Sequence, residues 1–301
     1  MNGILVIDKQ PSFTSFDVVA IVRGILREKK IGHSGTLDPM ATGVLPVLVG
    51  NAAKAQSLLP DTDKRYEADF RLGMTTDTLD ITGRVLSEVV CCHTAGEIEE
   101  ILPRFRGDIM QVPPMYSAVQ KNGVRLYDLA RQGIEIEREA RPVSVAELEL
   151  VSFDENDQSG RLVISCSKGT YIRVICDDIG KALGCGCVMT ALRRTAACGF
   201  TLEDAVTLEQ LQKLKDEGRA EEYIRPTDSI FRCFGEITVS EKQAVRFANG
   251  AALSLDRVKK TAGFDDGTML RVYGGGKFLG LGIVDIGSGE LRMKKNFSQG
   301  N

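Results

Sequence analysis

The sequence HSGTLDPMATG, at residues 33–43, is the part of the chain best suited to chemistry. It presents one carboxylate, Asp38, between two glycines that let the backbone turn sharply. Pro39 disfavours helical backbone at the aspartate and so fixes the direction of the carboxylate. A rigid loop that holds an aspartate near His33 is suited to placing a nucleophile. An ordinary turn has the same composition, so these residues alone do not identify a catalytic loop.

Metal chemistry finds little support in the sequence. Eight cysteines are present without a CxxC pair, and His33 and His93 are the only histidines. Zinc sites usually combine thiolates at two-residue spacing with further thiolates or imidazoles, and Cys185-Gly-Cys187 matches this poorly. We therefore expect no metal, and reduced cysteines that fill apolar space. They are Cys91, Cys92, Cys166, Cys176, Cys185, Cys187, Cys198 and Cys233.

Length and charge narrow the class of protein. The 301 residues suffice for one large domain and a small one. No run of about eighteen apolar residues occurs, and the opening MNGILVIDK is typical of a strand rather than a signal peptide, so we expect a cytoplasmic protein with no membrane span. With a formal net charge of −3, an RNA-binding protein must gather its cations on one face.

The elements expected around the 33–43 segment are strands and helices in irregular order. Alternation over residues 2–8 predicts a strand, and Thr14 or Ser15 is expected to cap a helix that runs to about Lys29. The apolar face of that helix is predicted to hold Phe16, Val19, Val22, Ile25 and Leu26. Strands are predicted at 44–49 and 65–72, and helices at 52–59 and, after a Thr94–Glu97 capping box, at 94–102.

The second half of the chain contains a long loop and a change of composition. Residues 110–142 are irregular, basic and proline-bearing, as is typical of a functional loop. Strands are predicted at 143–151 and 161–167, and helices at 171–183 and 208–214. After about Phe231, short strands separated by glycine indicate a small β-barrel or sandwich. We therefore predict an α+β fold with domains at 1–231 and 232–301.

Six blocks of sequence, in the same order, resemble the TruB family of tRNA pseudouridine synthases. Residues 33–43 are similar to that family's G-[AT]-L-D-P-x-A-[TS]-G loop, with the histidine at the expected place. The resemblance covers nearly all of residues 3–232, and the tail at 235–297 resembles, more weakly, a PUA-type RNA-binding domain. The other blocks are KRYEADFRLG (64–73), TDTLDITG (76–83), QVPPMYSAVQKNGVRLYDLAR (111–131), SKGTYIRVICDDIG (167–180) and ALRRTAACGF (191–200).

The chain departs from the family pattern in two places. The segment DKQPSFTS has Gln10 and Ser12 where the family usually has proline and glycine. Gln120 stands where a lysine is common, although Lys121 follows it. The first departure affects the shape of a loop and the second an RNA phosphate contact.

The resemblance implies a fold and a reaction. The fold is a central mixed, largely antiparallel sheet flanked by helices, with a small PUA-like β-barrel at the C-terminus. The reaction is the isomerisation of uridine 55 in the tRNA T-loop: the base is flipped out, the C1′–N1 bond breaks and a C1′–C5 bond forms. This chemistry needs no redox step, phosphate donor or metal, so no cofactor is expected. The expected partner is the T-arm stem-loop, without an obligate protein partner.

The resemblance also assigns roles to single residues. Asp38 is the catalytic aspartate and must be ionised, so a cationic neighbour is expected, and Arg173 is the family's candidate. Tyr66 occupies the position of an aromatic that stacks on the target base and takes part in proton transfer. The remaining substrate-binding residues are expected to be His33, Tyr171 and Leu192.

Basic residues of the loop and of the family blocks are expected to contact RNA phosphates, which gives an affinity that falls with salt. RNA loops are recognised largely through shape and splayed bases, and the T-loop fits that mode. The expected phosphate contacts are Lys9, Lys64, Arg104, Arg106, Lys121, Arg125, Arg131 and Arg194.

Two other functions find some support in the sequence. A tRNA-binding or tRNA-folding protein without catalysis would be free to lose Asp38, Tyr66 and Arg173, and all three are present. A nucleotide-binding enzyme is suggested by Gly274-Gly275-Gly276-Lys277, but a P-loop requires Ser or Thr next, where this chain has Phe278. The nucleotide-binding alternative is therefore rejected.

Overall fold

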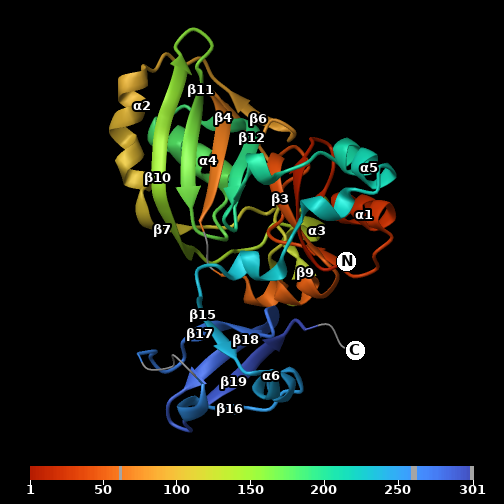
Figure 1. Ribbon diagram of the computed structural model, residues 1–301. Coiled ribbons are helices and arrows are strands. Elements are labelled where there is room, and N and C mark those ends of the chain that lie inside the picture. The colour runs from red at the N-terminus through yellow and green to blue at the C-terminus, as the bar shows by residue number, and fades with distance from the viewer. Residues whose placement is uncertain (61–62, 259–262, 299–301) are drawn as a thin grey trace.

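The computed structural model describes residues 1–60, 63–258 and 263–298 and builds them around two main sheets (Figure 1). A ten-stranded sheet draws its strands from residues 3–225, and a five-stranded sheet draws its strands from residues 235–296. The α-helices at 15–26, 95–101, 172–182 and 208–216 share one apolar core on a single face of the larger sheet, and 3-10 helices contribute to the core on the other face. The predicted α+β fold with a mixed, largely antiparallel central sheet is confirmed.

The ten-stranded sheet has the order β14-β1-β3-β12-β4-β11-β10-β7, with β2 paired to β3 and β13 paired to β12. The β12–β3 pairing is parallel and the other pairings are antiparallel. The strands are β1 (Gly3–Lys9), β2 (Ile31–His33), β3 (Thr42–Val49), β4 (Lys64–Leu72), β7 (Gly107–Gln111), β10 (Arg141–Asp154), β11 (Ser159–Cys166), β12 (Cys187–Ala197), β13 (Phe200–Thr201) and β14 (Ile224–Arg225).

The first helix, α1 (Ser15–Leu26), begins at its predicted cap. The Thr14 hydroxyl accepts a hydrogen bond from the amide of Asp17 at 3.1 Å, and the Asp17 carboxylate accepts one from the amide of Thr14 at 2.8 Å. The helix ends before the predicted Lys29 because Arg27 adopts a left-handed φ of 54°.

The predicted apolar face of α1 is wrong at one position. Phe16 is 66% exposed, whereas Val18, Val19 and Val22 are buried. The inward face therefore includes Val18 in place of Phe16, because the first turn is fixed by its cap rather than by burial of Phe16.

The other helices follow their predicted ranges closely. The helices α2 and α5 both begin with a capping box, and the predicted helix at 52–59 is a 3-10 helix. Gly180 lets α4 approach β12 closely, since a β-carbon there would lie 2.2 Å from the amide nitrogen of Cys187. The elements are η1 (Gly50–Leu58), α2 (Ala95–Ile101), η2 (Leu102–Phe105), α4 (Ile172–Ala182), η3 (Leu202–Asp204), α5 (Leu208–Asp216), η4 (Ala220–Tyr223) and η5 (Thr227–Phe231).

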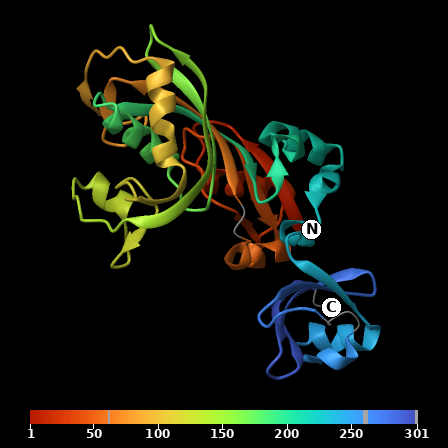
Figure 2. The same cartoon turned by 90° about the vertical axis from the view of Figure 1, so that its left-hand side faces the viewer.

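Between β7 and β10 the chain leaves the sheet, as predicted for the basic loop. This 112–140 segment also contains a helix, α3 (Leu126–Arg131), which was not predicted because it has six residues and no side-chain cap. A short ribbon of β8 (Gln120–Lys121) and β9 (Val124–Arg125) precedes the helix. Figure 2 shows the segment, in yellow-green, projecting from the body of the molecule away from the C-terminal sheet. A second ribbon, β5 (Met74–Thr76) with β6 (Val85–Glu88), follows β4.

The five-stranded sheet has the order β15-β17-β18-β19-β16 and one covering helix, α6 (Glu241–Ala248). It has its own core, which includes Ile237, Phe247, Val272 and Leu291. Gly274-Gly275-Gly276-Lys277 lies at the turn between two antiparallel strands, a setting unlike the strand-to-helix junction of a P-loop. The remaining elements are β15 (Gly235–Val239), β16 (Leu253–Ser254), η6 (Leu255–Arg257), β17 (Met269–Gly274), β18 (Lys277–Asp285) and β19 (Glu290–Asn296).

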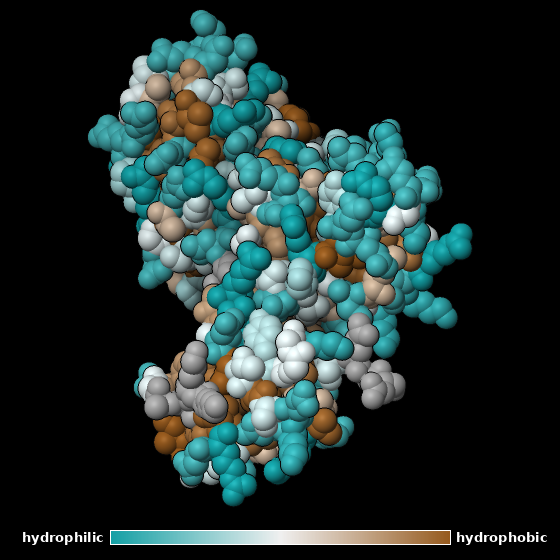
Figure 3. All heavy atoms as spheres, in the orientation of Figure 1, coloured by the Kyte–Doolittle hydropathy of each residue, from teal (hydrophilic) through white to brown (hydrophobic). Residues whose placement is uncertain are grey.

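An apolar cluster joins the two sheets. Phe231 is fully buried, and its ring centroid lies 5.6 Å from that of Phe297 and 6.4 Å from that of Phe278. The same cluster contains Ile4 and Val6 of β1, so the five-stranded sheet packs against the larger one. In the view of Figure 3, hydrophobic residues gather over the C-terminal sheet and in small areas above, and most of that face is hydrophilic. Among the described residues, no helix is both long and apolar enough to cross a membrane.

We predict that Phe231→Ala lowers the free energy of unfolding by about 3–5 kcal/mol, because a buried aromatic is replaced by a cavity where the two sheets meet. Urea unfolding of the full chain measures the change. Val151→Ala provides a control, since Val151 is 58% exposed and its truncation should change stability by less than about 0.5 kcal/mol. Equal effects of the two substitutions would contradict the role given to Phe231.

Candidate active site

Asp38 lies in the connection between β2 and β3, which α1 holds in place. The Ser15 hydroxyl accepts a hydrogen bond from the Leu37 amide at 2.9 Å, and the Ser12 amide donates to the Pro39 carbonyl at 2.9 Å. A turn closes the loop, with the Ala41 amide donating to the Asp38 carbonyl at 3.0 Å. The predicted rigid loop is therefore present, and its rigidity comes from contacts with the segment at 12–15.

Lys9 anchors the other side of this loop from within the protein. Its side chain is buried, and Nζ donates to the carbonyls of Gln10 at 3.0 Å, Pro39 at 3.1 Å and Ala41 at 2.5 Å. Burial lowers the pKa of Lys9 to about 8, against the opposing effect of Asp38. The prediction that Lys9 contacts RNA phosphates is wrong, because its ammonium group is already surrounded by loop carbonyls.

Arg194 is also buried and is likewise not a phosphate contact, contrary to the prediction. Its Nε donates to the Val44 carbonyl at 2.7 Å and its Nη2 to the Gly35 carbonyl at 3.2 Å. Gly43 pairs with Arg194 across the parallel β3–β12 contact, and a β-carbon at Gly43, where φ is 99°, would lie 2.2 Å from the Arg194 carbonyl oxygen. The second glycine of the loop is therefore required for this close approach.

Arg173 is the expected cationic neighbour of Asp38. Its Nη2 lies 3.3 Å from Oδ2 and 3.4 Å from Oδ1 of the carboxylate. The arginine side chain is 6% exposed, whereas that of Asp38 is 35% exposed. One face of the ion pair is therefore closed by protein, and the carboxylate remains accessible from the other.

The other groups that hold Arg173 were not predicted from the sequence. Nη2 donates to the Tyr116 carbonyl at 2.7 Å, and Nη1 lies 3.7 Å from Oδ2 of the buried Asp80. Asp80 accepts hydrogen bonds from Thr78 and Thr82, whose hydroxyls flank it in the TDTLDITG block. An acid between two threonines indicates a carboxylate held by hydrogen bonds, but the spacing does not reveal which cation it faces.

The pKa of the Asp38 carboxyl is raised above its ordinary value. Burial is the main cause, and the nearby Asp80 carboxylate adds to it. Arg173 and Lys9 act in the opposite direction, because both cations stabilise the ionised form. Two cations are therefore arranged to keep a partly buried carboxylate charged.

Three predicted pocket residues lie on elements around this pair. Tyr66, on β4, is 7% exposed; burial raises its pKa, and the Asp38 charge adds to the rise. Leu192, on β12, is also 7% exposed and pairs in register with Ala68 of β4. The Tyr171 ring centroid lies 5.9 Å from the guanidinium carbon of Arg173. The fold therefore brings Tyr66 and Tyr171 near the Asp38–Arg173 pair, with Leu192 on the strand beside Tyr66.

His33 is the last residue of β2, directly before the catalytic loop. The side chain is buried, and its ring meets that of Phe16 edge-on, with centroids 5.6 Å apart. Burial and the charge of Arg194 lower the pKa of His33, which favours the neutral ring.

The other predicted phosphate contacts lie in different surroundings. In the 112–140 segment, Lys121 donates to the Glu137 carbonyl at 2.7 Å, and the guanidinium carbons of Arg125 and Arg131 lie 5.7 and 5.4 Å from the Tyr127 ring centroid. These three cations are exposed on one projecting segment.

The remaining three predicted cations lie outside that segment. Lys64 lies beside Gly35 of the catalytic loop, and Arg104 is exposed on η2. Arg106 directs Nε and Nη2 to the Leu148 carbonyl, at 2.9 and 2.6 Å, so part of its guanidinium group already binds the sheet.

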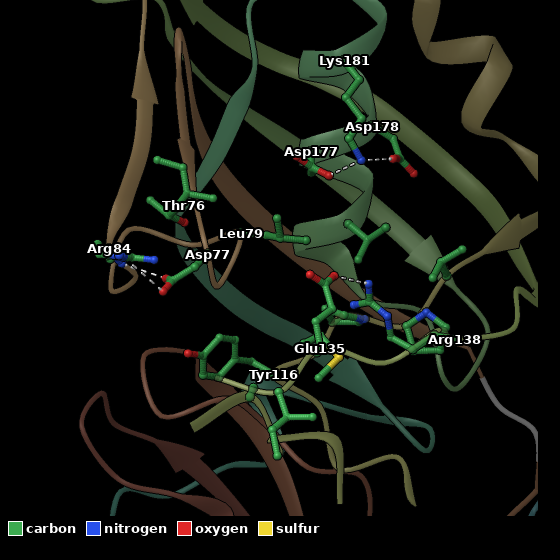
Figure 4. A pocket seen from close by; sticks show the side chains of 18 of the residues that line it. Thr76, Asp77, Leu79, Arg84, Tyr116, Glu135, Arg138, Asp177, Asp178 and Lys181 are labelled. Carbon is green, nitrogen blue, oxygen red and sulfur yellow. Dashed lines mark hydrogen bonds and ion pairs between the residues drawn. The ribbon is translucent and has the colours of Figure 1, made fainter. Parts of the chain in front are cut away.

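A cavity of about 660 Å³ lies between α4, the β5–β6 ribbon and the 112–140 segment (Figure 4). Neither Asp38 nor Arg173 lines it, and Tyr116, whose carbonyl accepts a hydrogen bond from Arg173, is the residue that links it to the ion pair. Leu79 and Tyr116 border it, and Lys181 lies 2.5 Å from Asp177 and 3.4 Å from Asp178 on its α4 side. The cavity has apolar and charged walls. Within the part of the chain that the structure describes, no group of His, Cys, Asp and Glu side chains has a metal-binding arrangement.

We predict that Lys9→Met destabilises the protein by about 2–4 kcal/mol, because three loop carbonyls lose their common donor. Thermal and urea unfolding measure the loss. Lys121→Met is the matched control, since that lysine is exposed and its removal should be nearly neutral. If Lys9→Met left the free energy of unfolding unchanged but weakened RNA binding, the phosphate-contact role that the geometry argues against would be restored.

Comparisons with known proteins agree with this geometry. Residues 23–172 match the family model for the N-terminal domain of the TruB family pseudouridylate synthases, and residues 173–232 match that for the tRNA pseudouridylate synthase B C-terminal domain. The boundary between the two matches falls within α4, and both lie before the five-stranded sheet.

Curated relatives and solved structures extend over nearly the whole chain. The chain is 45% identical over 287 residues to the tRNA pseudouridine synthase B of Clostridium perfringens, covering 95% of this chain and 96% of the relative. It is 43% identical over 288 residues to the protein of that name from Stutzerimonas stutzeri, covering 94% and 92%. A chain in the crystal structure of a Cbf5-Nop10-Gar1 complex superposes with a TM-score of 0.76 at 25% identity, covering 98% of this chain and 85% of that chain. This chain therefore belongs to the TruB family of pseudouridylate synthases.

Proposed function

We propose that this protein isomerises uridine 55 in the T-loop of tRNA to pseudouridine, with Asp38 as the catalytic nucleophile. The observation that carries the proposal is the Asp38–Arg173 pair, in which a partly accessible carboxylate is held by a buried guanidinium at 3.3 Å. Family membership supports a pseudouridine synthase, and the names of the relatives support tRNA as the substrate. Such an enzyme works where tRNA is, so we place it in the cytoplasm.

The reaction exchanges one glycosidic bond for another without loss of atoms from the nucleotide. The C1′–N1 bond breaks, the uracil turns, and a C1′–C5 bond forms; C5 then loses its hydrogen and N1 gains one. An ionised Asp38 can add to the ring or to the sugar, or stabilise charge at C1′. Its two neighbouring cations favour the ionised state that each route needs.

Positioning is the task of the surrounding side chains. In this proposal the flipped uracil enters between Tyr66, Tyr171 and Leu192, which offer two aromatic rings and one apolar side chain. Extruding the base costs a few kcal/mol, which contacts with the rest of the arm must offset. The neutral His33 is suited to apolar contact with a base rather than to ion pairing with phosphate.

Binding of the T-arm is assigned to two surfaces. Lys121, Arg125 and Arg131 on the 112–140 segment would contact phosphates, with Lys64 and Arg104 as further candidates. Residues 232–301 would form a second, PUA-like RNA-binding unit. We propose that neither surface needs a protein partner.

The decisive test is tritium release from a tRNA transcript labelled at uridine C5, because formation of the C1′–C5 bond expels that hydrogen. We expect release with the wild type and none with Asp38→Asn, which removes the charge but keeps the shape. The affinity of the variant for tRNA should stay within a few-fold. Asp108→Asn is the matched control, since Asp108 is exposed on β7 and should leave turnover unchanged.

Each other outcome has a definite meaning. Normal turnover by Asp38→Asn would eliminate the proposed mechanism. Binding without release by the wild type would favour the alternative, a tRNA-binding or tRNA-folding protein without catalysis. A transcript in which uridine 55 is replaced by cytidine should give no release, and release from it would show that another uridine is the target.

We predict a bell-shaped dependence of kcat/KM on pH. Activity is lost as pH falls through the pKa of Asp38, which lies above the ordinary 3.8, because the carboxyl then takes up a proton. Activity declines again above about pH 8, where Lys9 loses a proton and one of the donors that anchor the loop. Asp80→Asn should move the acid limb to lower pH, because a negative neighbour that raises the pKa is removed. An acid limb unaffected by Asp80→Asn would contradict the assignment to Asp38.

A further inference from the structure

The start of α1 forms the rim of the catalytic loop. Ser15 exchanges hydrogen bonds with Leu37, the residue before Asp38, donating to its carbonyl at 3.3 Å and accepting from its amide at 2.9 Å. The next residue along the helix, Phe16, is therefore tied to the loop that presents the carboxylate. Its backbone is fixed by the Thr14 capping box.

Phe16 is the only exposed aromatic side chain among the twelve phenylalanines and six tyrosines, all of which lie in the described part of the chain. Phe16 is 66% exposed and takes no part in the apolar cores. A side chain this exposed buries little apolar area when the chain folds, so it adds little to the free energy of unfolding. The position beside the catalytic loop therefore calls for another explanation.

The single ring contact of Phe16 leaves the ring available. It meets His33 at an interplanar angle of 89°, an edge-to-face arrangement with centroids 5.6 Å apart. An edge contact of this kind leaves a π-face of the exposed ring open to solvent. The contact with the buried His33 holds the Phe16 ring in place, so a planar group can stack on Phe16 at small conformational cost.

The surroundings of Phe16 fit a planar ligand better than an apolar surface. Gln10, Ser12, Thr14 and Asp17 are exposed polar residues around the helix start, and Phe16 is the one large apolar side chain exposed there. A protein or membrane interface needs a contiguous apolar area of several hundred Å². A single base needs one aromatic face, and stacking is the usual way in which proteins hold unpaired bases.

We propose that Phe16 is a stacking platform for an unpaired base of the RNA substrate, next to the uridine that reaches Asp38. This inference rests on the proposed function, because it takes the loop at 33–43 as the reacting centre. A phenyl ring has no hydrogen-bonding group, so the platform accepts any base and contributes affinity and positioning without reading identity. Phe16 is therefore a positioning residue, and its loss should affect KM rather than the chemical step.

The test uses the full chain, an unmodified tRNA transcript and the tritium-release assay. Phe16→Ala and Phe16→Leu should both raise KM about 5- to 100-fold, because each removes the π-face. The leucine variant keeps an apolar side chain and so separates stacking from apolar contact. The change in kcat should be no more than about twofold, and Phe16→Tyr should restore the wild-type KM. Val151→Ala is the matched control, because Val151 is similarly exposed but lies on β10 close to the hairpin at the top of Figure 1.

A second measurement reports stacking directly and does not require turnover. The chain contains no tryptophan, so Phe16→Trp introduces a single tryptophan, at the platform. Stacking on a base should quench its fluorescence as tRNA is added, whereas Val151→Trp should respond little. Unchanged KM in Phe16→Ala and Phe16→Leu, or an unquenched Trp at saturating tRNA, would overturn the proposal. Absence of tritium release by the wild type would instead refute the proposed function, while the quenching experiment still decides the role of Phe16.

Discussion

The site depends on one buried guanidinium. Arg173 enters from the first turn of α4 and contacts Asp38, Asp80 and the Tyr116 carbonyl at once. Each partner comes from a different segment: the catalytic loop, the block after β5 and the 112–140 segment. A buried charge is stable only when it is paired and hydrogen-bonded, so the position of the arginine requires all three segments to be in place. The same requirement links the projecting 112–140 segment to the reacting carboxylate.

Two further cations are used for structure rather than for RNA. Lys9 and Arg194 are buried on either side of the catalytic loop and donate to its carbonyls and to that of Val44. A loop cannot satisfy these carbonyls through a regular ladder, and the two side chains supply the missing donors. The loop is therefore rigid without being regular, which is the condition for holding a carboxylate in a reactive direction.

The surface around the carboxylate has three kinds of side chain, each suited to a different part of an RNA. Exposed cations lie on the 112–140 segment, the exposed Phe16 ring lies at the start of α1, and less exposed aromatic rings lie next to Asp38. The exposed cations suit phosphates, the exposed ring suits a stacked base, and the less exposed rings suit the flipped base. The apolar cluster around Phe231 fixes the five-stranded sheet to the larger one, so a second RNA-binding surface would have a defined place relative to the site.

Local features of this chain could be predicted from its sequence, because they depend on neighbouring residues. The capping box at Thr14 follows from short-range preferences. Arg173 was indicated by the family blocks, since an arginine on a helix does not by itself indicate a catalytic role. Which cations face solvent depends instead on tertiary packing. Lys9 and Lys121 are the same residue type and each is the last residue of a strand, yet the first is buried beneath the catalytic loop and the second is exposed on the projecting segment. The acid that faces Arg173 from between two threonines also depends on tertiary packing, which brings Asp80 and α4 together. Spacing along the chain does not encode that packing, because it joins segments that are separated in the sequence.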